Sequence, residues 1–153
     1  DLVLIMQKLS HLIEEMTASE YHITLFMGLY DKITSDLTYV NAGHYPPLLF
    51  SKKNEPQKLN SKGIGIGGAP FEYQAEKIRI ERGDLLLMYT DGVIEAVNEN
   101  GEIFGEQRLM QIVSEKLNQN CENIQDEITL RILDHCNDCP LKDDFTLFII
   151  KRK

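Results

Sequence analysis

The stretch that decides the expected fold is residues 83–105, GDLLLMYTDGVIEAVNENGEIFG. Its first half holds a short apolar run, residues 85–89 (LLLMY), with turn residues on both sides. Such a run is typical of a fully buried strand. We therefore expect Asp91 to leave the core where the strand ends, next to Gly92, which permits a tight turn and the close approach of a ligand. A carboxylate held there is a candidate ligand for a hard cation, although an isolated Asp-Gly pair is more often a simple turn.

A second group of acids opens the last expected strand, residues 143–150 (DDFTLFII). If the two strands are antiparallel neighbours, the end of one adjoins the start of the other, and Asp91 converges with Asp143 and Asp144. Carboxylates that lie this close repel one another unless one is protonated or a cation lies between them. Oxygen ligands favour Mg²⁺ or Mn²⁺ over zinc or copper. On spacing alone, two unrelated solvated turns remain an open alternative.

The rest of the chain predicts short strands followed by helices. β-Branched and aromatic residues predict a hairpin of residues 22–30 and 37–42, and further strands at residues 48–51, 57–59 and 73–80. Because turn-length links join these strands, we expect antiparallel sheets, and the order of elements gives an α+β fold.

Three amphipathic helices are also expected. The first covers residues 2–16, and its apolar stripe consists of Leu2, Ile5, Leu9, Leu12, Ile13 and Met16. The second covers residues 106–117. The third covers residues 123–136, with Asn123 as candidate N-cap and with an apolar face of Ile124, Ile128, Ile132 and Leu133.

Composition narrows the class of protein. The 153 residues are 42% hydrophobic and 26% charged, which suits one folded domain over residues 1–153. A net charge of -8 argues against a nucleic-acid partner, because neutralising phosphates requires clustered Lys and Arg. Neither a membrane-length apolar run nor a signal-like leader is recognised. Three cysteines do not make a disulfide framework, so we expect a reducing compartment, the cytoplasm.

The spacing of Cys136 and Cys139 beside His135 raises the question of zinc or redox chemistry. A structural zinc site normally has four ligands, and the only other cysteine is Cys121. We interpret the pair as ordinary thiols at a helix end.

Five segments, in this order, resemble the metal-dependent serine/threonine protein phosphatases of type 2C (the PPM class), in the bacterial branch of sporulation stage II E and stress-response phosphatases. They are residues 41–47 (NAGHYPP), 63–67 (GIGIG), 83–96 (GDLLLMYTDGVIEA), 104–109 (FGEQRL) and 143–147 (DDFTL). Each segment alone is a weak signal. Their ordered combination over nearly the whole chain is specific.

The resemblance implies two antiparallel sheets packed as a sandwich and flanked by helices, with two Mn²⁺ or Mg²⁺ ions at one edge. A water between the metals would attack the phosphorus of phosphoserine or phosphothreonine. By motif, Asp91 and Asp143 correspond to metal ligands, and Asp144 has a supporting role at the metal or its waters. The implied substrate is a phosphorylated regulatory protein of the anti-sigma-factor-antagonist type.

Other motif residues are interpreted structurally. His44 could donate to phosphate or carry a proton, but a histidine in a turn such as residues 41–47 more often stabilises the loop, with Asn41 as a neighbour. The glycines at positions 63, 65, 67 and 68 lack the Lys-Ser/Thr of a P-loop, so we expect them to serve as backbone turns. Glu95 is expected to brace the turn after Asp91.

Two motifs of the resembled family are missing, Gly-Asp-x-x-Asp and Asp-x-x-Gly-x-Gly, which supply bridging ligands. We therefore expect an N-terminally truncated domain with an incomplete metal site, inactive alone and prone to self-association through exposed sheet edges. Two functions follow: a phosphatase in the parent protein, or a non-catalytic partner-binding module with the same fold. The retained acids Asp91, Asp143 and Asp144 favour the phosphatase.

Overall fold

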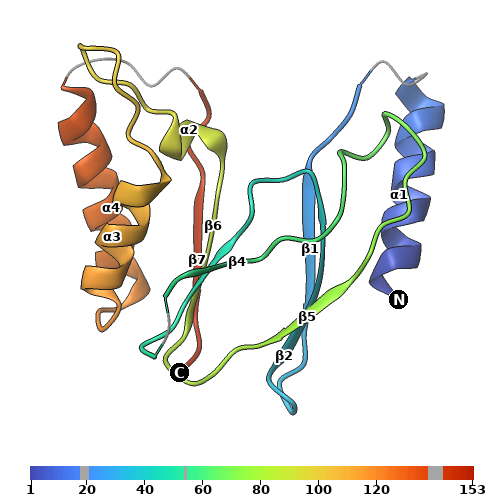
Figure 1. Cartoon of the computed structure of the whole chain (residues 1–153), viewed down its shortest axis with the longest axis horizontal. Helices are drawn as coiled ribbons and strands as arrows, with labels where there is room; N and C mark the ends of the chain where they lie inside the picture. The colour runs from blue at the N-terminus through green and yellow to red at the C-terminus, as the bar shows by residue number, and fades with distance from the viewer. Residues whose placement is uncertain (18–20, 54, 138–142) are drawn as a thin grey trace. The chain divides into compact units, whose positions relative to one another are not determined.

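The computed structural model of the chain describes residues 1–17, 21–53, 55–137 and 143–153. They form two compact units, one of Asp1–Pro46 with Leu59–Glu81 and one of Pro47–Lys58 with Arg82–Lys153. Each unit has one antiparallel sheet and its own helix or helices (Figure 1). The α+β class with two antiparallel sheets is therefore confirmed, while the single domain over residues 1–153 stays a prediction.

The first unit combines helix α1 (Leu2–Thr17) with a sheet in the order β1-β2-β5. The expected hairpin is β1 (Leu25–Tyr30) paired antiparallel with β2 (Asp36–Ala42). Its turn is fixed by Asp31, whose Oδ1 accepts a hydrogen bond from the amide of Ile33 over 2.7 Å. The turn closes through Ser35, a non-glycine residue with a φ of 66°.

Helix α1 forms as expected, but a different stripe is buried. Met6 is fully buried, and Leu2, Leu9 and Ile13 pack against the same core, which includes Val40 and Tyr73 of this unit. Three members of the expected stripe are instead exposed: Ile5, Leu12 and Met16. The prediction was wrong because the helix carries two overlapping sets of apolar residues, and in both sets successive members are four, three and four positions apart. Periodicity alone does not show which set faces the sheet.

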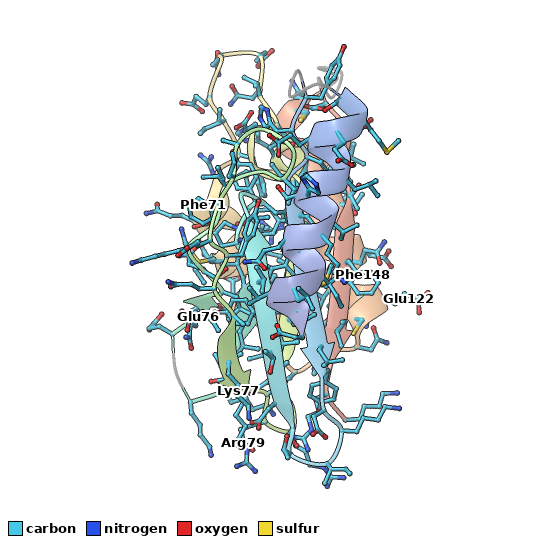
Figure 2. All side chains as sticks on the ribbon, turned by 90° about the vertical axis from the view of Figure 1, so that its right-hand side faces the viewer. Phe71, Glu76, Lys77, Arg79, Glu122 and Phe148 are labelled. Carbon is cyan, nitrogen blue, oxygen red and sulfur yellow. The ribbon has the colours of Figure 1, made fainter. Side chains whose placement is uncertain are left out.

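Strand β5 (Glu76–Arg79) is shorter than the predicted strand over residues 73–80. Tyr73 precedes it as a buried residue whose hydroxyl donates to the carbonyl oxygen of Ile64 over 3.2 Å. Charged side chains mark β5 as an edge strand, and Glu76, Lys77 and Arg79 are labelled along it in Figure 2. Lys77 pairs with Asp36 of β2 at 2.6 Å. Charges on an edge strand discourage pairing with another chain.

The second unit contains a sheet in the order β4-β3-β6-β7, with antiparallel pairing throughout. Strand β3 spans Leu48–Phe50, β4 spans Gln57–Lys58, β6 spans Leu85–Tyr89 and β7 spans Leu147–Lys151. The central strand β6 is buried as predicted, apart from the half-buried Met88. Residues 143–146 were expected to belong to the last strand, but they precede it.

Three helices complete the second unit: α2 (Asp91–Ile94), α3 (Glu106–Lys116) and α4 (Cys121–Cys136). Helices α3 and α4 lie side by side, and α4 packs against β7 (Figure 1). Their apolar faces are buried, and the buried residues are Leu109, Ile112, Val113, Ile124, Ile128, Ile132 and Cys136. Both long helices of this unit therefore form where the sequence predicts them.

Two details of α4 differ from the prediction. The N-cap is Asn120, whose side chain accepts a hydrogen bond from the amide of Asn123 over 2.7 Å, so Asn123 is not the cap. Leu133 is 54% exposed and Cys136 takes the fourth buried position. The buried residues of α4 thus repeat every four positions, and the thiol acts as a small apolar side chain.

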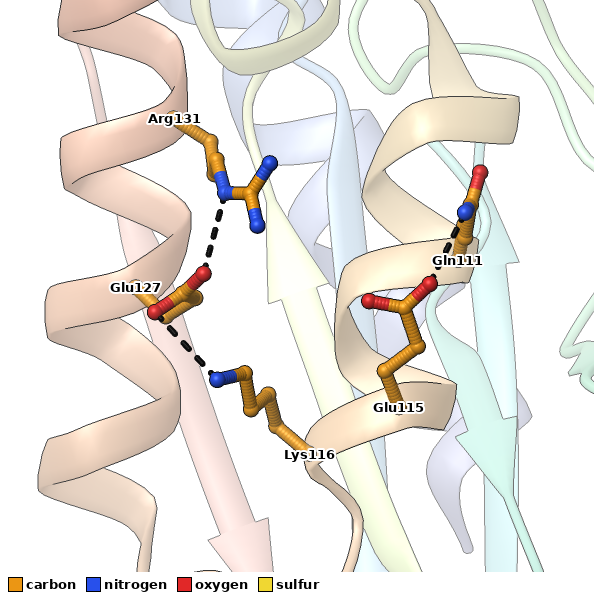
Figure 3. A network of polar contacts seen from close by, with 5 residues as sticks. All are labelled: Gln111, Glu115, Lys116, Glu127 and Arg131. Carbon is orange, nitrogen blue, oxygen red and sulfur yellow. Dashed lines mark hydrogen bonds and ion pairs between the residues drawn. The ribbon is translucent and has the colours of Figure 1, made fainter.

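A polar network joins the two long helices (Figure 3). Glu127 of α4 pairs with Arg131 of its own helix at 2.9 Å and with Lys116 of α3 at 3.5 Å. The hydrogen bond from Arg131, reinforced by the charge of Lys116, lowers the pKa of the Glu127 carboxyl below its ordinary value. On α3 itself, Gln111 donates to Glu115 over 2.8 Å.

Candidate metal centre

The acids predicted to converge lie where β6 ends and the segment before β7 begins. In the register of these strands, Tyr89 is opposite Leu147, so Asp91 follows one strand where Asp143 and Asp144 approach the other. The two backbone segments that carry the acids therefore approach each other, as the predicted convergence requires.

Thr90 fastens these two segments together. Its hydroxyl donates to the carbonyl oxygen of Asp144 over 2.8 Å and accepts from the amide of Thr146 over 3.0 Å. Its own amide donates to the carbonyl oxygen of Thr146 over 3.2 Å. Sequence reasoning missed this residue. Its only signal was a hydroxyl side chain directly before Asp91.

Gly92 is buried against the same segment. A Cβ at this position would lie 2.5 Å from the carbonyl oxygen of Asp144 and 3.2 Å from that of Asp143. Any side chain would push the two segments apart. The atoms that approach Gly92 closely are therefore those of the segment that carries Asp143 and Asp144.

The chain after β6 turns into α2 rather than a simple turn. The amide of Glu95 donates to the carbonyl oxygen of Asp91 over 2.8 Å, which closes a single helical turn. The carboxylate of Asp91 stands in the first turn of this short helix.

Backbone amides orient two of the candidate carboxylates. Oδ1 of Asp91 accepts from the amide of Gly92 over 3.0 Å, and Oδ1 of Asp143 accepts from the amide of Asp144 over 2.7 Å. Asp91 is half-buried, while Asp143 and Asp144 are exposed. Carboxylate oxygens at the surface suit Mg²⁺ or Mn²⁺, which keep several waters.

These carboxylates fit part of a divalent-cation centre. In the described ranges, no group of three or more His, Cys, Asp and Glu side chains is arranged to hold a metal ion. A Mg²⁺ ion requires near-octahedral oxygen coordination, so two carboxylates leave most of the positions to water or to other ligands.

Asn41 and His44 occupy a loop of the first unit. The side-chain amide of Asn41 donates to the carbonyl oxygen of His44 over 2.9 Å, and its Oδ1 accepts from the His44 amide over 2.8 Å. Asn41 is buried, and the His44 ring Nδ1 lies 3.5 Å from the hydroxyl of Thr24. These bonds support the loop-stabilising interpretation.

The neighbouring glycines act as backbone turns. Gly67 has a φ of 91°, and a Cβ at Gly63 would overlap the carbonyl oxygen of Asn41. Neither glycine opens a helix, which a phosphate-cradling loop would do.

Among the residues with described side chains, Cys121, Cys136 and His135 belong to no group of three or more potential metal ligands. Cys136 is buried at the end of α4 and Cys139 lies outside the described residues, so the interpretation of the pair as ordinary thiols stays a prediction. His135 contacts other partners: its Nε2 lies 2.9 Å from the carbonyl oxygen of Glu102, and its ring packs edge-on against Phe104.

Among the described helices, none has both the length and the apolar character that crossing a bilayer requires.

Among the curated proteins that match, two are similar over most of the chain. Protein IcfG of Synechocystis is 32% identical over 130 residues, which are 84% of this chain and 20% of that protein. Phosphoserine phosphatase RsbU of Bacillus subtilis is 28% identical over 151 residues, which are 97% of this chain and 44% of that protein. The chain thus spans less than half the length of either relative.

Solved structures share the fold. The SiaA-PP2C domain of Pseudomonas aeruginosa matches with a TM-score of 0.85 at 18% identity, over 99% of this chain and 61% of that one. The manganese-presoaked phosphatase domain of SpoIIE from Bacillus subtilis matches with a TM-score of 0.60 at 17% identity, over 84% of this chain and 56% of that one. The fold is therefore that of PP2C-type phosphatase domains.

The family model of stage II sporulation protein E (SpoIIE) matches residues 1–153, the full sequence. This match agrees with the resemblance that the five ordered motifs indicate. The chain belongs to the SpoIIE family of PPM-type phosphatase domains.

Proposed function

We propose that the protein containing this chain is a metal-dependent phosphatase that hydrolyses phosphoserine or phosphothreonine on a regulatory protein. The observation that carries the proposal is the close approach at the end of β6. Thr90 and Gly92 bring the backbone of Asp143 and Asp144 against the turn that starts at Asp91. A fold that only displayed a binding surface would not require this close approach of the two segments that carry the acids.

Each residue of the centre has a separate task. Asp91 and Asp143 each offer a carboxylate to a divalent cation, Mn²⁺ or Mg²⁺, and the backbone bonds to their Oδ1 atoms restrict how they turn. Asp144 supports the cation or its waters. Bound cations would lower the pKa of a water and screen the charge of the phosphoryl group. Gly92 keeps the two ligand-bearing segments at contact distance.

The remaining ligands of a two-ion centre are assigned to parts of the protein outside this cluster. Two or three carboxylates do not fill the coordination of two ions. The isolated chain is therefore expected to bind Mn²⁺ weakly and to lack activity.

The substrate class follows from the family and from RsbU, a curated relative that is named a phosphoserine phosphatase. We propose a phosphorylated regulatory protein of the anti-sigma-factor-antagonist type, met in the cytoplasm. The net charge of -8 disfavours nucleic acid as the partner.

The test is phosphate release from a phosphoserine protein by the full-length protein, stripped of metal and titrated with Mn²⁺. We expect activity that rises with Mn²⁺, disappears with a chelator and is absent from an Asp91→Asn, Asp143→Asn double variant. A folded wild type that binds a phosphoprotein but releases no phosphate at saturating Mn²⁺ or Mg²⁺ would establish the non-catalytic module instead.

A further inference from the structure

A pocket of about 350 Å³ lies directly beside Asp143. Its lining consists of Gly92, Glu95, Ala96, Val97, Ile103 and Asp143. The lining thus combines a candidate metal ligand, Asp143, with the aliphatic side chains of Ala96, Val97 and Ile103. The pocket is large enough for one large apolar side chain, and Asp143, a candidate ligand of the cation, is part of its lining.

The exposed aliphatic residue of this pocket is Ile103, which is 58% exposed. A single exposed isoleucine is ordinary on a protein surface. Ile103 differs because its loop is rigidly built. Oδ1 of Asn98 accepts from the amides of Asn100 and Glu102 over 3.0 and 2.9 Å, and its Nδ2 donates to the Glu102 carboxylate over 3.0 Å.

Two backbone hydrogen bonds and a contact from α4 also hold this loop in place. The amide of Phe104 donates to the carbonyl oxygen of Ala96 over 2.8 Å, and the amide of Gly105 donates to that of Ile94 over 2.8 Å. His135 of α4 contacts the carbonyl oxygen of Glu102. Because these bonds hold the loop in place, a ligand that packs on Ile103 loses little affinity to loop ordering.

We propose that this pocket receives an apolar side chain of the phosphoprotein substrate, one or two residues from the phosphorylated residue. The inference rests on the proposed function, since it requires the phosphoryl group to reach cations held by Asp143. An extended peptide advances about 3.3 Å per residue, so a near neighbour of the phosphorylated residue falls within the adjoining pocket. The carboxylate of Glu95, which also lines the pocket, disfavours an acidic side chain there.

The experiment measures kcat/KM of the full-length protein for phosphoserine peptides that differ only in the flanking residue: Leu, Ala or Asp. Each rate is divided by the rate on an aryl phosphate, which has no flanking residue and reports the chemistry alone. We expect the wild type to prefer Leu over Ala by about tenfold and to reject Asp, because the pocket removes more apolar surface from water with the larger side chain.

Ile103→Asp should remove the preference for Leu, and Ile103→Ala should reduce it. Ile33→Asp is the matched control, because Ile33 is an isoleucine that is 95% exposed in the turn after β1, so this variant should keep the wild-type preference. Binding of a non-hydrolysable phosphonate peptide should weaken in parallel in the Ile103 variants.

The outcomes separate the two proposals. Equal rates on all three peptides, with normal aryl phosphate hydrolysis, would overturn the pocket assignment and leave the phosphatase intact. No hydrolysis of either substrate by the wild type would remove the proposed function first. A change of oligomeric state in Ile103→Asp, with peptide preference retained, would show that the pocket contacts a second copy of the chain and would also overturn the assignment.

Discussion

The hydroxyl of Thr90 and the carbonyl oxygen of Asp144, which are 54 positions apart in the sequence, are joined by a 2.8 Å hydrogen bond. The same hydroxyl accepts from the amide of Thr146, so one side chain serves both as donor and as acceptor to the segment before β7. Because of these two hydrogen bonds, the position of Asp143 and Asp144 depends on Thr90, a residue that carries no charge.

Thr90→Val keeps the shape of the side chain but removes both bonds. Because a hydrogen bond contributes roughly 0.5–1.5 kcal/mol net, we expect a loss of about 1–3 kcal/mol in the free energy of unfolding, together with weaker Mn²⁺ binding. Denaturant unfolding and metal titration measure the two effects. Thr90→Ser retains the hydroxyl and should stay close to the wild type. Equal losses in both variants would mean that the hydroxyl is not what joins the segments.

Gly92→Ala tests the close approach directly. Helix propensity alone would favour alanine in α2 by about 1 kcal/mol. The added Cβ would lie 2.5 Å from the Asp144 carbonyl oxygen, so we expect a net destabilisation of about 1–3 kcal/mol from overpacking. The control is Gly68→Ala, where the nearest atom to a new Cβ is the His22 Cβ at 3.5 Å. A Gly92→Ala protein as stable as the wild type would show that the segments separate freely.

The three acids should not be equal in catalysis. Asp91→Asn or Asp143→Asn in the full-length protein should lower turnover by several orders of magnitude, because each removes an anionic ligand from the cations that activate the nucleophile. Asp144→Asn should have a milder effect. Asp126→Asn, an exposed carboxylate on α4, is the matched control. Phosphatase assays across a Mn²⁺ titration rank the variants, and wild-type turnover in Asp91→Asn would remove that residue from the centre.

The sequence predicts an element well where its hydrophobic pattern is compatible with only one buried arrangement. The run Leu85–Tyr89 is uniformly apolar and bounded by turn residues, so its burial as β6 does not depend on which face is chosen. Antiparallel pairing with β7 then places the end of β6, just before Asp91, next to the segment that leads into β7 and carries the last acids. The approach of the two backbone segments was therefore accessible from the sequence, while the convergence of the three carboxylates stays a prediction.

Errors arise where the pattern has two solutions of similar quality. Helix α1 offers stripes through Ile5 or through Met6, and only packing against Val40 and Tyr73 selects Met6. Thr90 was missed for a different reason. Its only local signal is a hydroxyl next to Asp91, and the spacing of residues does not reveal a bond to backbone groups more than fifty positions away.

The N-cap of α4 gives a direct comparison of two asparagines. Asn120 accepts the amide of Asn123, while the sequence favoured Asn123 itself as the cap. Replacing an N-cap residue by alanine costs about 1 kcal/mol, so Asn120→Ala should lower the free energy of unfolding by that amount. Asn123→Ala, inside the exposed first turn, should change it by less than about 0.5 kcal/mol. Chemical denaturation of the two variants decides between the caps, and the reverse order would restore the sequence-based assignment.

The network around Glu127 predicts a pH-dependent contribution to stability. The hydrogen bond from Arg131 comes first and the charge of Lys116 second in lowering the pKa of Glu127 from its ordinary value of 4.5. A carboxyl whose pKa is lowered in the folded state contributes stability above its unfolded pKa and loses that contribution as the pH falls through the folded pKa. Glu127→Gln should therefore have a lower Tm than the wild type at neutral pH.

The difference in Tm between Glu127→Gln and the wild type should shrink as the pH falls below 4.5 and the carboxylate of the wild type takes up a proton. In an Arg131→Gln background the same substitution should have a smaller effect at neutral pH, because the two residues share one interaction. Thermal unfolding of the four proteins across acid and neutral pH measures both effects. A Tm difference that stays constant down to strongly acidic pH would mean that Glu127 stabilises the pair of helices through packing of its side chain rather than through its charge.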